Sequence, residues 1–278
     1  METSRQYSFI NDENGFTISL IDGHELIKTL AKIHNIGPNA LDYYRKTVLS
    51  SLQMINFIKP TESLGFYIDS EDPFYRFKIE MSNSGTLRTL LLPEEFEDLP
   101  HQLTGKCRIT KIMQDTNPYT SILDFTDHPV ENLVNEVMEK SYQTNSKIIT
   151  DKTYSTSLML TKLPSSNIDK KIETFEDISL DKIEQKYHQI IQAALLLPAH
   201  SIEDYVQLFN TAGFSYLGSK EVKFHCPCSK ERMIDNIFTL RKEDREDLFS
   251  DRSVIETRCD YCNSVYDIQK NEIIKNLH

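Results

Sequence analysis

Residues 225–232 read HCPCSKER and residues 259–273 read CDYCNSVYDIQKNEI. These stretches hold four of the chain's five cysteines, as Cys226-x-Cys228 and Cys259-x-x-Cys262, with 30 residues between the two pairs. Two close cysteine pairs on either side of a short segment are typical of a site that presents four thiolates tetrahedrally to one zinc ion. We therefore expect these four cysteines to bind one Zn²⁺.

The region around the cysteines, residues 221–278, is predicted to be a small zinc-binding domain. A segment of about 55 residues rarely forms a dependable core alone, so metal binding would supply part of its folding free energy. Ser229 is expected to cap a helix after the first pair, because a serine hydroxyl accepts from the first backbone N–H groups of a helix. The buried face of that helix is predicted to contain Met233, Ile234, Ile237 and Phe238.

The spacing alone leaves open whether this zinc is a permanent structural ion. Binding of nucleic acid is disfavoured, because the chain has a net charge of −11 and the region from Glu221 onward has 10 basic and 12 acidic residues. A thioredoxin-like role for the second pair is also disfavoured. It needs a helix after the cysteines, whereas residues 265–268, VYDI, have the pattern of a strand.

Composition and charge indicate a water-soluble protein of 278 residues and 32.3 kDa, with 39% apolar residues, 26% charged residues and a mean hydropathy of −0.44. The longest apolar run, residues 193–197, is far too short to span a bilayer. The start, METSRQYSFINDENG, lacks the pattern of a secretory signal, so we expect a cytoplasmic protein with no membrane partner. Its odd number of cysteines in a reducing compartment argues against paired structural disulfides.

Residues 1–164 are predicted to form an α+β domain: a mixed sheet of about five or six strands with packed helices. Alternating apolar and polar residues predict strands at 16–21, 66–68, 75–81, 87–91, 107–109 and 123–125, and residues 158–160 are expected to return a last strand to the sheet. Apolar residues at helical spacing predict helices over 24–34, from Pro38 to Ile55 and after Pro129.

Residues 165–220 are predicted to be a helical linker that begins with a polar connector over 165–177. Two amphipathic helices follow, and the second begins with the capping-box pattern Ser201-x-x-Asp204. Their apolar residues are expected to lie on one stripe; they are Ile183, Tyr187, Ile190, Ile191, Ala194, Leu195, Tyr205, Val206, Leu208 and Phe209. Taken alone, such a stripe favours ordinary permanent packing on the core.

The cysteine-rich stretches resemble the C-terminal zinc domain of the bacterial 33-kilodalton heat-shock redox-regulated chaperone family. The resemblance lies in the C-x-C followed by Ser229-Lys-Glu-Arg232, and in the C-x-x-C followed by Tyr266. Weaker matches are GTLR at 85–88, YQTNS at 142–146 and the segment 208–224. The chain departs from the family pattern at Asp72-Pro73, Asn145 and Arg241, which indicates a divergent member.

This resemblance implies a holdase, a chaperone that binds unfolding polypeptides without ATP and is switched on by oxidation, with dimerisation in the oxidised state. The 1–164 domain would then bind substrate and dimerise. Zinc-bound cysteines are thiolates, the form that oxidants attack. Oxidation would release the zinc, with Cys226–Cys228 and Cys259–Cys262 as the local disulfides, and would forfeit about 10–16 kcal/mol of metal-derived folding energy. The zinc domain would unfold and uncover the linker stripe.

Two other functions remain as alternatives to the chaperone. The first is a constitutive adaptor whose structural zinc domain binds a folded protein partner. The second, less favoured, is an enzyme such as a thiol-disulfide oxidoreductase; we expect no catalytic residues and no organic cofactor. Cys107 is predicted to be an inert buried thiol in a strand, and His225 is expected to lie beside the zinc site or on the surface.

Overall fold

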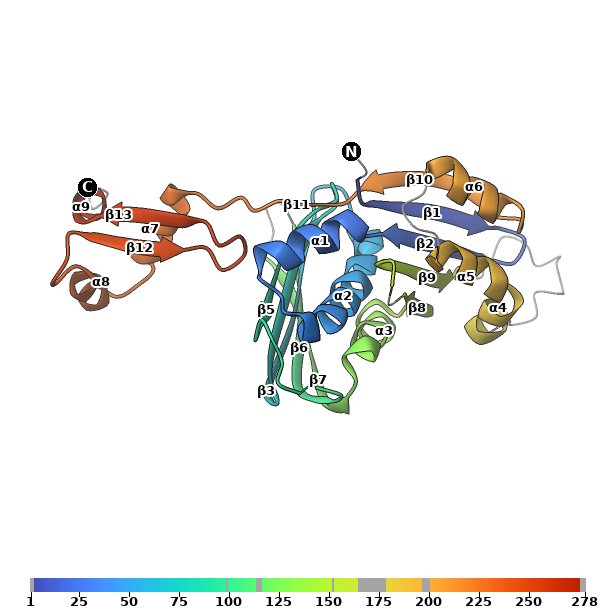
Figure 1. Ribbon diagram of the computed structural model, residues 1–278, viewed down its shortest axis with the longest axis horizontal. Helices are drawn as coiled ribbons and strands as arrows, with labels where there is room; N and C mark the ends of the chain where they lie inside the picture. The colour runs from blue at the N-terminus through green and yellow to red at the C-terminus, as the bar shows by residue number, and fades with distance from the viewer. Residues whose placement is uncertain are drawn as a thin grey trace. The chain divides into compact units, whose positions relative to one another are not determined.

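The computed structural model describes residues 3–98, 100–113, 117–151, 153–164, 179–196 and 201–275 (Figure 1). The chain divides into two compact units, Met1–Phe224 and His225–His278. Both units mix helices and strands, so the predicted α+β class is confirmed. No helix in the described ranges has the length and apolar character needed to cross a membrane.

The first sheet of the larger unit has five antiparallel strands. Its order is β10 (Ser215–Glu221), β1 (Arg5–Asn11), β2 (Phe16–Asp22), β9 (Thr156–Lys162) and β8 (Ser146–Thr150). The predicted strands over 16–21 and 158–160 are β2 and β9. Strands β1, β8 and β10 were not predicted, because each is rich in polar residues. They are strands because their backbones pair with neighbours that are distant in the sequence.

The second sheet has six strands and contains the clear alternating patterns. Its order is β11 (Lys223–Phe224), β5 (Thr86–Leu92), β4 (Phe74–Ser82), β3 (Ser63–Asp72), β6 (Leu103–Ile112) and β7 (Tyr119–His128). All neighbours are antiparallel except β11 and β5, which are parallel. The expectation that residues 158–160 would join this sheet is wrong, since β9 belongs to the first sheet. Alternation identifies a strand but not its partner.

Helices bury the predicted apolar faces against the six-stranded sheet. They are α1 (His24–Ile33), α2 (Pro38–Leu52), the 3₁₀ helix η1 (Gln53–Phe57) and α3 (Val130–Tyr142). Pro38 occupies the first turn of α2, where its missing N–H would have had no helical partner. Val48 and Leu49 of α2, and Leu133 of α3, are completely buried. The helix predicted after Pro129 is therefore confirmed.

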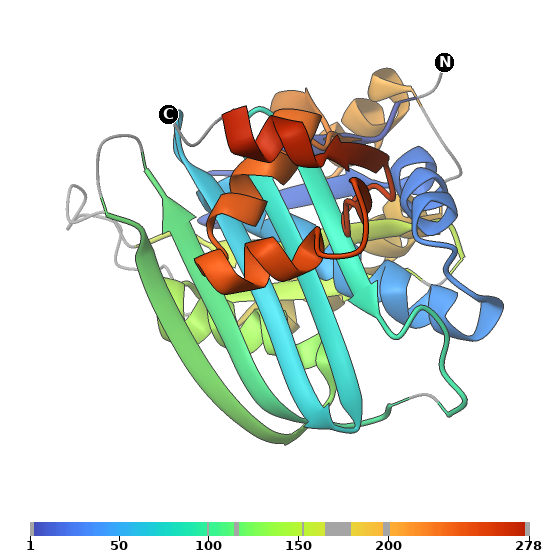
Figure 2. The ribbon, with the colours of Figure 1, turned by 90° about the vertical axis from the view of Figure 1, so that its left-hand side faces the viewer.

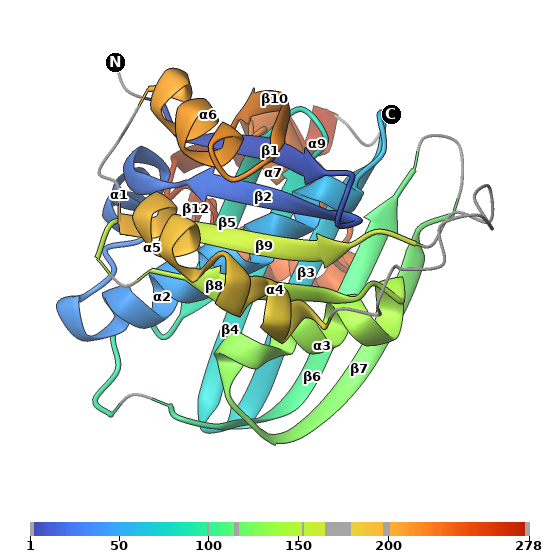
Figure 3. The same cartoon turned by 90° about the vertical axis from the view of Figure 1, so that its right-hand side faces the viewer.

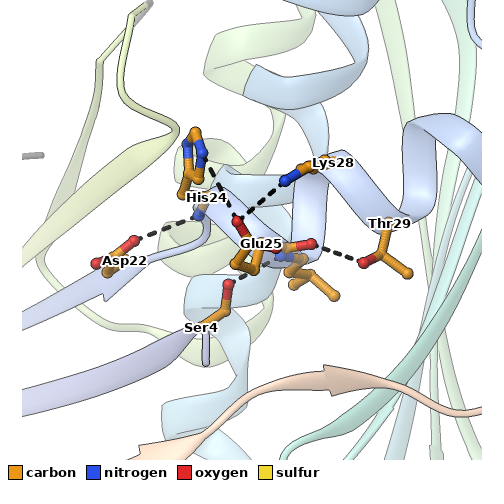
Figure 4. Close-up of polar contacts among 7 residues, drawn as sticks. Ser4, Asp22, His24, Glu25, Lys28 and Thr29 are labelled. Carbon is orange, nitrogen blue, oxygen red and sulfur yellow. Dashed lines mark hydrogen bonds and ion pairs between the residues drawn. The ribbon is translucent and has the colours of Figure 1, made fainter. Parts of the chain in front are cut away.

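The start of α1 obtains its hydrogen-bond acceptors from outside the helix. Gly23 at the N-cap has no side chain to accept, and the backbone N–H of His24 donates to Asp22 Oδ1 at 3.3 Å. The N–H of Leu26 donates to Ser4 Oγ at 2.9 Å (Figure 4). These bonds satisfy N–H groups that a helix leaves unpaired, and they attach α1 to the N-terminal strands.

The described part of the linker contributes three helices, and they pack on the five-stranded sheet (Figure 3). They are α4 (Leu180–Lys186), α5 (His188–Leu196) and α6 (Ile202–Asn210). The first predicted linker helix is two helices, because the backbone leaves helical geometry at Tyr187. The Ser201 capping box of α6 is confirmed. The predicted connector over 165–177 lies outside the described residues.

Ring contacts dominate the packing of α6 on strand β1. The ring centroids of Phe9 and Phe209 are 4.3 Å apart, and those of Tyr7 and Tyr205 are 4.9 Å apart. Both Phe9 and Phe209 are completely buried. Each aromatic pair of this kind adds about 0.5–1.5 kcal/mol beyond the burial of its area. The linker stripe is therefore closely packed against the sheet.

Backbone hydrogen bonds attach the segment that follows the linker to the ends of strands in both sheets. After β10, the backbone N–H of Val222 donates to the Ser4 carbonyl at 2.9 Å, and that of Lys223 donates to the Gly85 carbonyl at 3.0 Å. Gly85 has a φ of +92°, and a Cβ there would lie 1.9 Å from the Glu221 carbonyl oxygen. Only glycine allows this close approach, which holds the chain immediately before the first cysteine pair.

The smaller unit is built around a two-stranded antiparallel sheet. Its elements are α7 (Lys230–Phe238), α8 (Lys242–Leu248), β12 (Val254–Arg258), β13 (Val265–Gln269) and α9 (Lys270–Lys275) (Figure 1). Ile234 and Ile237 are buried and Met233 and Phe238 are partly buried, so the predicted face of the helix is confirmed. The core is small and includes only a few other side chains, such as Ile268.

Candidate metal centre

The four predicted cysteine ligands lie together in the smaller unit. All four sulfur atoms are within 4.8 Å of one another. Cys226 Sγ lies 3.7 Å from Cys259 Sγ, and Cys228 Sγ lies 3.2 Å from Cys262 Sγ. The two pairs are separated by 30 residues in the sequence, so the fold of this unit brings them together.

Local backbone structure positions each cysteine pair. Cys228 directly precedes α7, where the Ser229 hydroxyl accepts from the backbone N–H of Arg232 and caps the helix as predicted. Cys259 and Cys262 lie between β12 and β13. There the N–H of Cys259 donates to the Ser264 carbonyl at 2.9 Å, and the N–H of Asn263 donates to the Cys259 carbonyl at 2.8 Å. These bonds fold the second pair into a tight turn.

The four sulfurs form a donor set suited to a metal ion. A tetrahedron with Zn–S bonds of about 2.3 Å has sulfur–sulfur edges of about 3.8 Å, close to the observed 3.7 Å separation of Cys226 and Cys259. Cys259 is buried and the other three cysteines are half-buried. Four thiolates select soft or borderline ions such as zinc or iron over magnesium or calcium. These residues could therefore hold a metal ion.

The pKa values of the two cysteines in the second pair are shifted in opposite directions. Burial raises the pKa of Cys259 to about 12. Burial also opposes ionisation of Cys262, but hydrogen bonds with Ser264 and with the neighbouring sulfurs outweigh it and lower its pKa to about 7. A bound cation would favour the thiolate at every position, because a coordinating thiol is deprotonated.

Two residues beside the cluster were not predicted to contact it. The Tyr266 hydroxyl lies 3.1 Å from Cys228 Sγ, and the Ser264 hydroxyl lies 3.2 Å from Cys262 Sγ. Ser264 follows its cysteine by two residues, so its reach was detectable from spacing. Tyr266 is 38 residues from Cys228, and only the return of β13 brings it close.

The remaining two candidates lie outside the cluster. Cys107 is in β6, 1% exposed, and burial raises the pKa of its thiol well above the ordinary range. His225 is exposed and is not among the grouped metal-binding side chains. The larger unit buries Cys107 as predicted, which makes this thiol a poor nucleophile.

Fold and site together define an α+β protein whose C-terminal unit groups four cysteines that could hold a metal ion. The profile of the family described as Hsp33 protein matches residues 4–269, nearly the whole sequence. The chain belongs to the Hsp33 family. Membership in this family supports a chaperone function.

Similar proteins cover almost the full length of the chain. A 33 kDa chaperonin from Thermosipho melanesiensis is 21% identical over 93% of each chain. One from Aquifex aeolicus is 19% identical over 92% of this chain and 84% of its own. The crystal structure of the 33 kDa chaperonin from Thermotoga maritima, a heat shock protein 33 homolog, has the same fold. Its TM-score is 0.73 at 16% identity, covering 100% of this chain and 98% of that one.

Proposed function

We propose that this protein is a redox-regulated, ATP-independent holdase that binds unfolding polypeptides under oxidative stress. The observation that carries the proposal is the cysteine cluster, which joins the start of the smaller unit to its β12–β13 turn, in a unit with a very small apolar core. Residues 1–164 would bind substrate and dimerise, 165–220 would be the linker, and 221–278 would be the switch. Relatives named as chaperonins, a class that is not enzymatic, support a binding function over catalysis.

Zinc is the proposed ion, held by Cys226, Cys228, Cys259 and Cys262. When bound, it would keep the four sulfurs deprotonated and would link the two segments that carry them. The protein supplies the rest of the site: the caps and turns orient the sulfurs, and the Tyr266 and Ser264 hydroxyls contact two of them. Such contacts tune the charge on a thiolate.

Activation would be the oxidation of paired cysteines. Each disulfide forms when two thiolates give up two electrons, and hydrogen peroxide accepts these electrons with two protons from solvent to form two water molecules. Cys226–Cys228 and Cys259–Cys262 are the proposed pairs. Close sulfur contacts in the folded unit also join Cys226 to Cys259 and Cys228 to Cys262. Local pairs are nevertheless favoured once the unit opens, because closing a short loop costs less entropy than closing a long one.

Loss of the metal would unfold the smaller unit, because its core is too small to hold the fold. The linker helices would then detach from the five-stranded sheet. Detachment would expose aromatic side chains on the sheet and on the helices. They include Phe9 and Phe209, which are completely buried in the folded protein. Two apolar surfaces uncovered together would bind non-native polypeptides and favour a homodimer.

The chain's net charge of −11 supports a protein client over nucleic acid, because phosphate groups would be repelled. Neither nucleic acid nor a membrane is a proposed partner. The proposed location is the cytoplasm, where reducing conditions would keep the cysteines available for metal binding.

The decisive experiment measures metal content, free thiols and suppression of client aggregation before and after peroxide treatment. We expect one zinc per chain and no suppression when reduced, then zinc release and strong suppression when oxidised. Cys228→Ser should lose most of the zinc, whereas the matched variant Cys107→Ser should keep it. Release of zinc without suppression would overturn the chaperone proposal and favour the structural-zinc adaptor.

A further inference from the structure

The six-stranded sheet ends in a long open edge at β7. Among the described residues β7 pairs only with β6, and Figures 2 and 3 show it as the outer strand of the sheet. Its register with β6 is regular from Tyr119, opposite Lys111, to Phe125, opposite Gly105. In an antiparallel edge strand, alternate residues direct their backbone N–H and C=O groups away from the sheet. Strand β7 therefore offers a row of backbone groups to a further strand.

The other sheet edges are protected along most of their length, whereas the register shift of β7 and the positive φ of Asp127 lie beyond its regular stretch from Tyr119 to Phe125. Strand β8 has five residues, and its Lys147 forms ion pairs with Asp181 at 2.7 Å and Glu184 at 2.6 Å. Strand β10 is interrupted by a register shift opposite Ser8 and by Gly218, whose φ is +145°. Strand β11 has two residues and lies on β5, whose central residues are mostly buried. Short strands, charges and bulges of this kind prevent edge pairing.

Strand β7 also exposes large apolar side chains beside its backbone. Tyr119 is 57% exposed and Ile122 is 60% exposed. The strand contains no proline and no lysine, the residues that most often block pairing at an edge. Its charges are acidic, Asp124 and Asp127, and Asp124 lies 3.7 Å from Lys106 on the neighbouring strand.

We propose that the β7 edge binds extended segments of non-native polypeptides by adding them to the sheet as a seventh strand. The proposal rests on the holdase function above and identifies a surface where a client would bind. Backbone hydrogen bonds would supply affinity for many sequences, as a chaperone requires, while Ile122 and Tyr119 would favour apolar side chains. Folded proteins would be rejected, because their strands are already paired.

The charge of the edge indicates which segments bind best. The two acidic residues of β7 and the net charge of −11 favour neutral or basic segments over acidic ones. The same net charge disfavours pairing of β7 between two copies of this chain. The edge is open while the cysteine cluster is assembled, so the reduced protein should bind clients weakly. Exposure of the linker surfaces would add a second contact and raise the affinity.

Hydrogen exchange tests the edge directly. The oxidised protein is mixed with reduced, carboxamidomethylated lysozyme, a basic unfolded polypeptide, and deuterium uptake is followed in peptides covering residues 119–125. We expect clear slowing there when the client binds, and no change in the central strand β4. Bound client with unchanged exchange over 119–125 would overturn the proposal.

A variant pair tests the contribution of the edge to affinity. Ile122→Lys places a charge on the exposed edge, and Phe74→Lys adds the same charge at the end of the sheet, where Phe74 is 47% exposed. We expect Ile122→Lys to weaken lysozyme binding about three- to fivefold and Phe74→Lys to leave it unchanged. Carboxamidomethylated α-lactalbumin, a related but acidic polypeptide, should bind the wild type more weakly than lysozyme.

The outcomes separate the two proposals. If wild type and Ile122→Lys bind lysozyme equally while wild type still suppresses aggregation, the proposal for the β7 edge is overturned and the holdase proposal stands. Failure of the oxidised wild type to bind either client would overturn both.

Discussion

A buried histidine in the larger unit shows how environment determines the chemistry of a single residue. His34, at the end of α1, is 2% exposed, and its Nε2 lies 3.3 Å from the Thr89 hydroxyl. Thr89 is also 2.5 Å from the Tyr44 hydroxyl. Burial lowers the pKa of His34 to about 4, and a hydrogen bond with the Thr89 backbone only partly opposes this shift. At neutral pH His34 is therefore uncharged and part of the core.

This shift predicts that acid destabilises the larger unit. The unfolded chain takes up a proton on His34 near its ordinary pKa of 6.5, whereas the folded protein does so only near 4. His34 thus contributes stability that is complete above pH 6.5 and is lost as the pH falls towards 4, by up to about 3 kcal/mol. Denaturant unfolding at several pH values should show this loss. The variant His34→Gln should show a smaller loss, and an identical pH dependence would contradict the assignment.

Among the elements, the linker helices have the clearest energetic role. Their apolar stripe could be predicted from spacing, but its partner, the five-stranded sheet, could not. Leu195 and Ile191 of α5 and Tyr205 and Phe209 of α6 are all buried on this sheet. The linker is thus held mainly by side-chain packing, which a single large-to-small substitution can weaken.

Phe209→Ala should partly activate the reduced protein. Removing a fully buried phenylalanine costs about 3–5 kcal/mol, enough to shift α6 towards the detached state. We expect increased binding of an apolar-surface dye and some suppression of aggregation without oxidation, while the metal stays bound. Leu196→Ala is the control, because Leu196 is 48% exposed and its truncation removes little packing. Unchanged dye binding in Phe209→Ala would argue against the linker as the covered surface.

At the scale of the whole molecule, the two units differ in what holds them together. The larger unit has two extensive apolar clusters that cover both sheets. The smaller unit has a core of a few isoleucines and Phe249, so its stability should depend on the ion that the four cysteines are proposed to hold. This difference allows one unit to unfold while the other remains folded.

Metal removal should therefore unfold the smaller unit and leave the larger unit folded. Treating the reduced protein with a strong chelator should abolish amide protection in β12 and β13, because about 10–16 kcal/mol of metal-derived folding energy is lost. Amides in the central strands β3 and β4 should stay protected. Restoring zinc under reducing conditions should restore protection in the smaller unit. Persistent amide protection in β12 and β13 without metal would show that the smaller unit does not need the metal to fold.

Features that depend on residues close together in the sequence could be predicted from it. The spacing of the cysteines indicated the metal centre, and Ser201 and Ser229 marked the starts of their helices. Alternation located most strands of the six-stranded sheet. Each signal depends on residues close in the chain, whose geometry follows from the period of a helix or strand.

Only the tertiary structure decided how these pieces combine. It placed the strands in two sheets, made strands of the polar segments β1, β8 and β10, divided the first linker helix at Tyr187 and left β7 as an open edge. It also brought Tyr266 to Cys228. These features depend on pairing between residues far apart in the sequence. The free energy of such pairing comes from long-range packing and hydrogen bonds that no local pattern records.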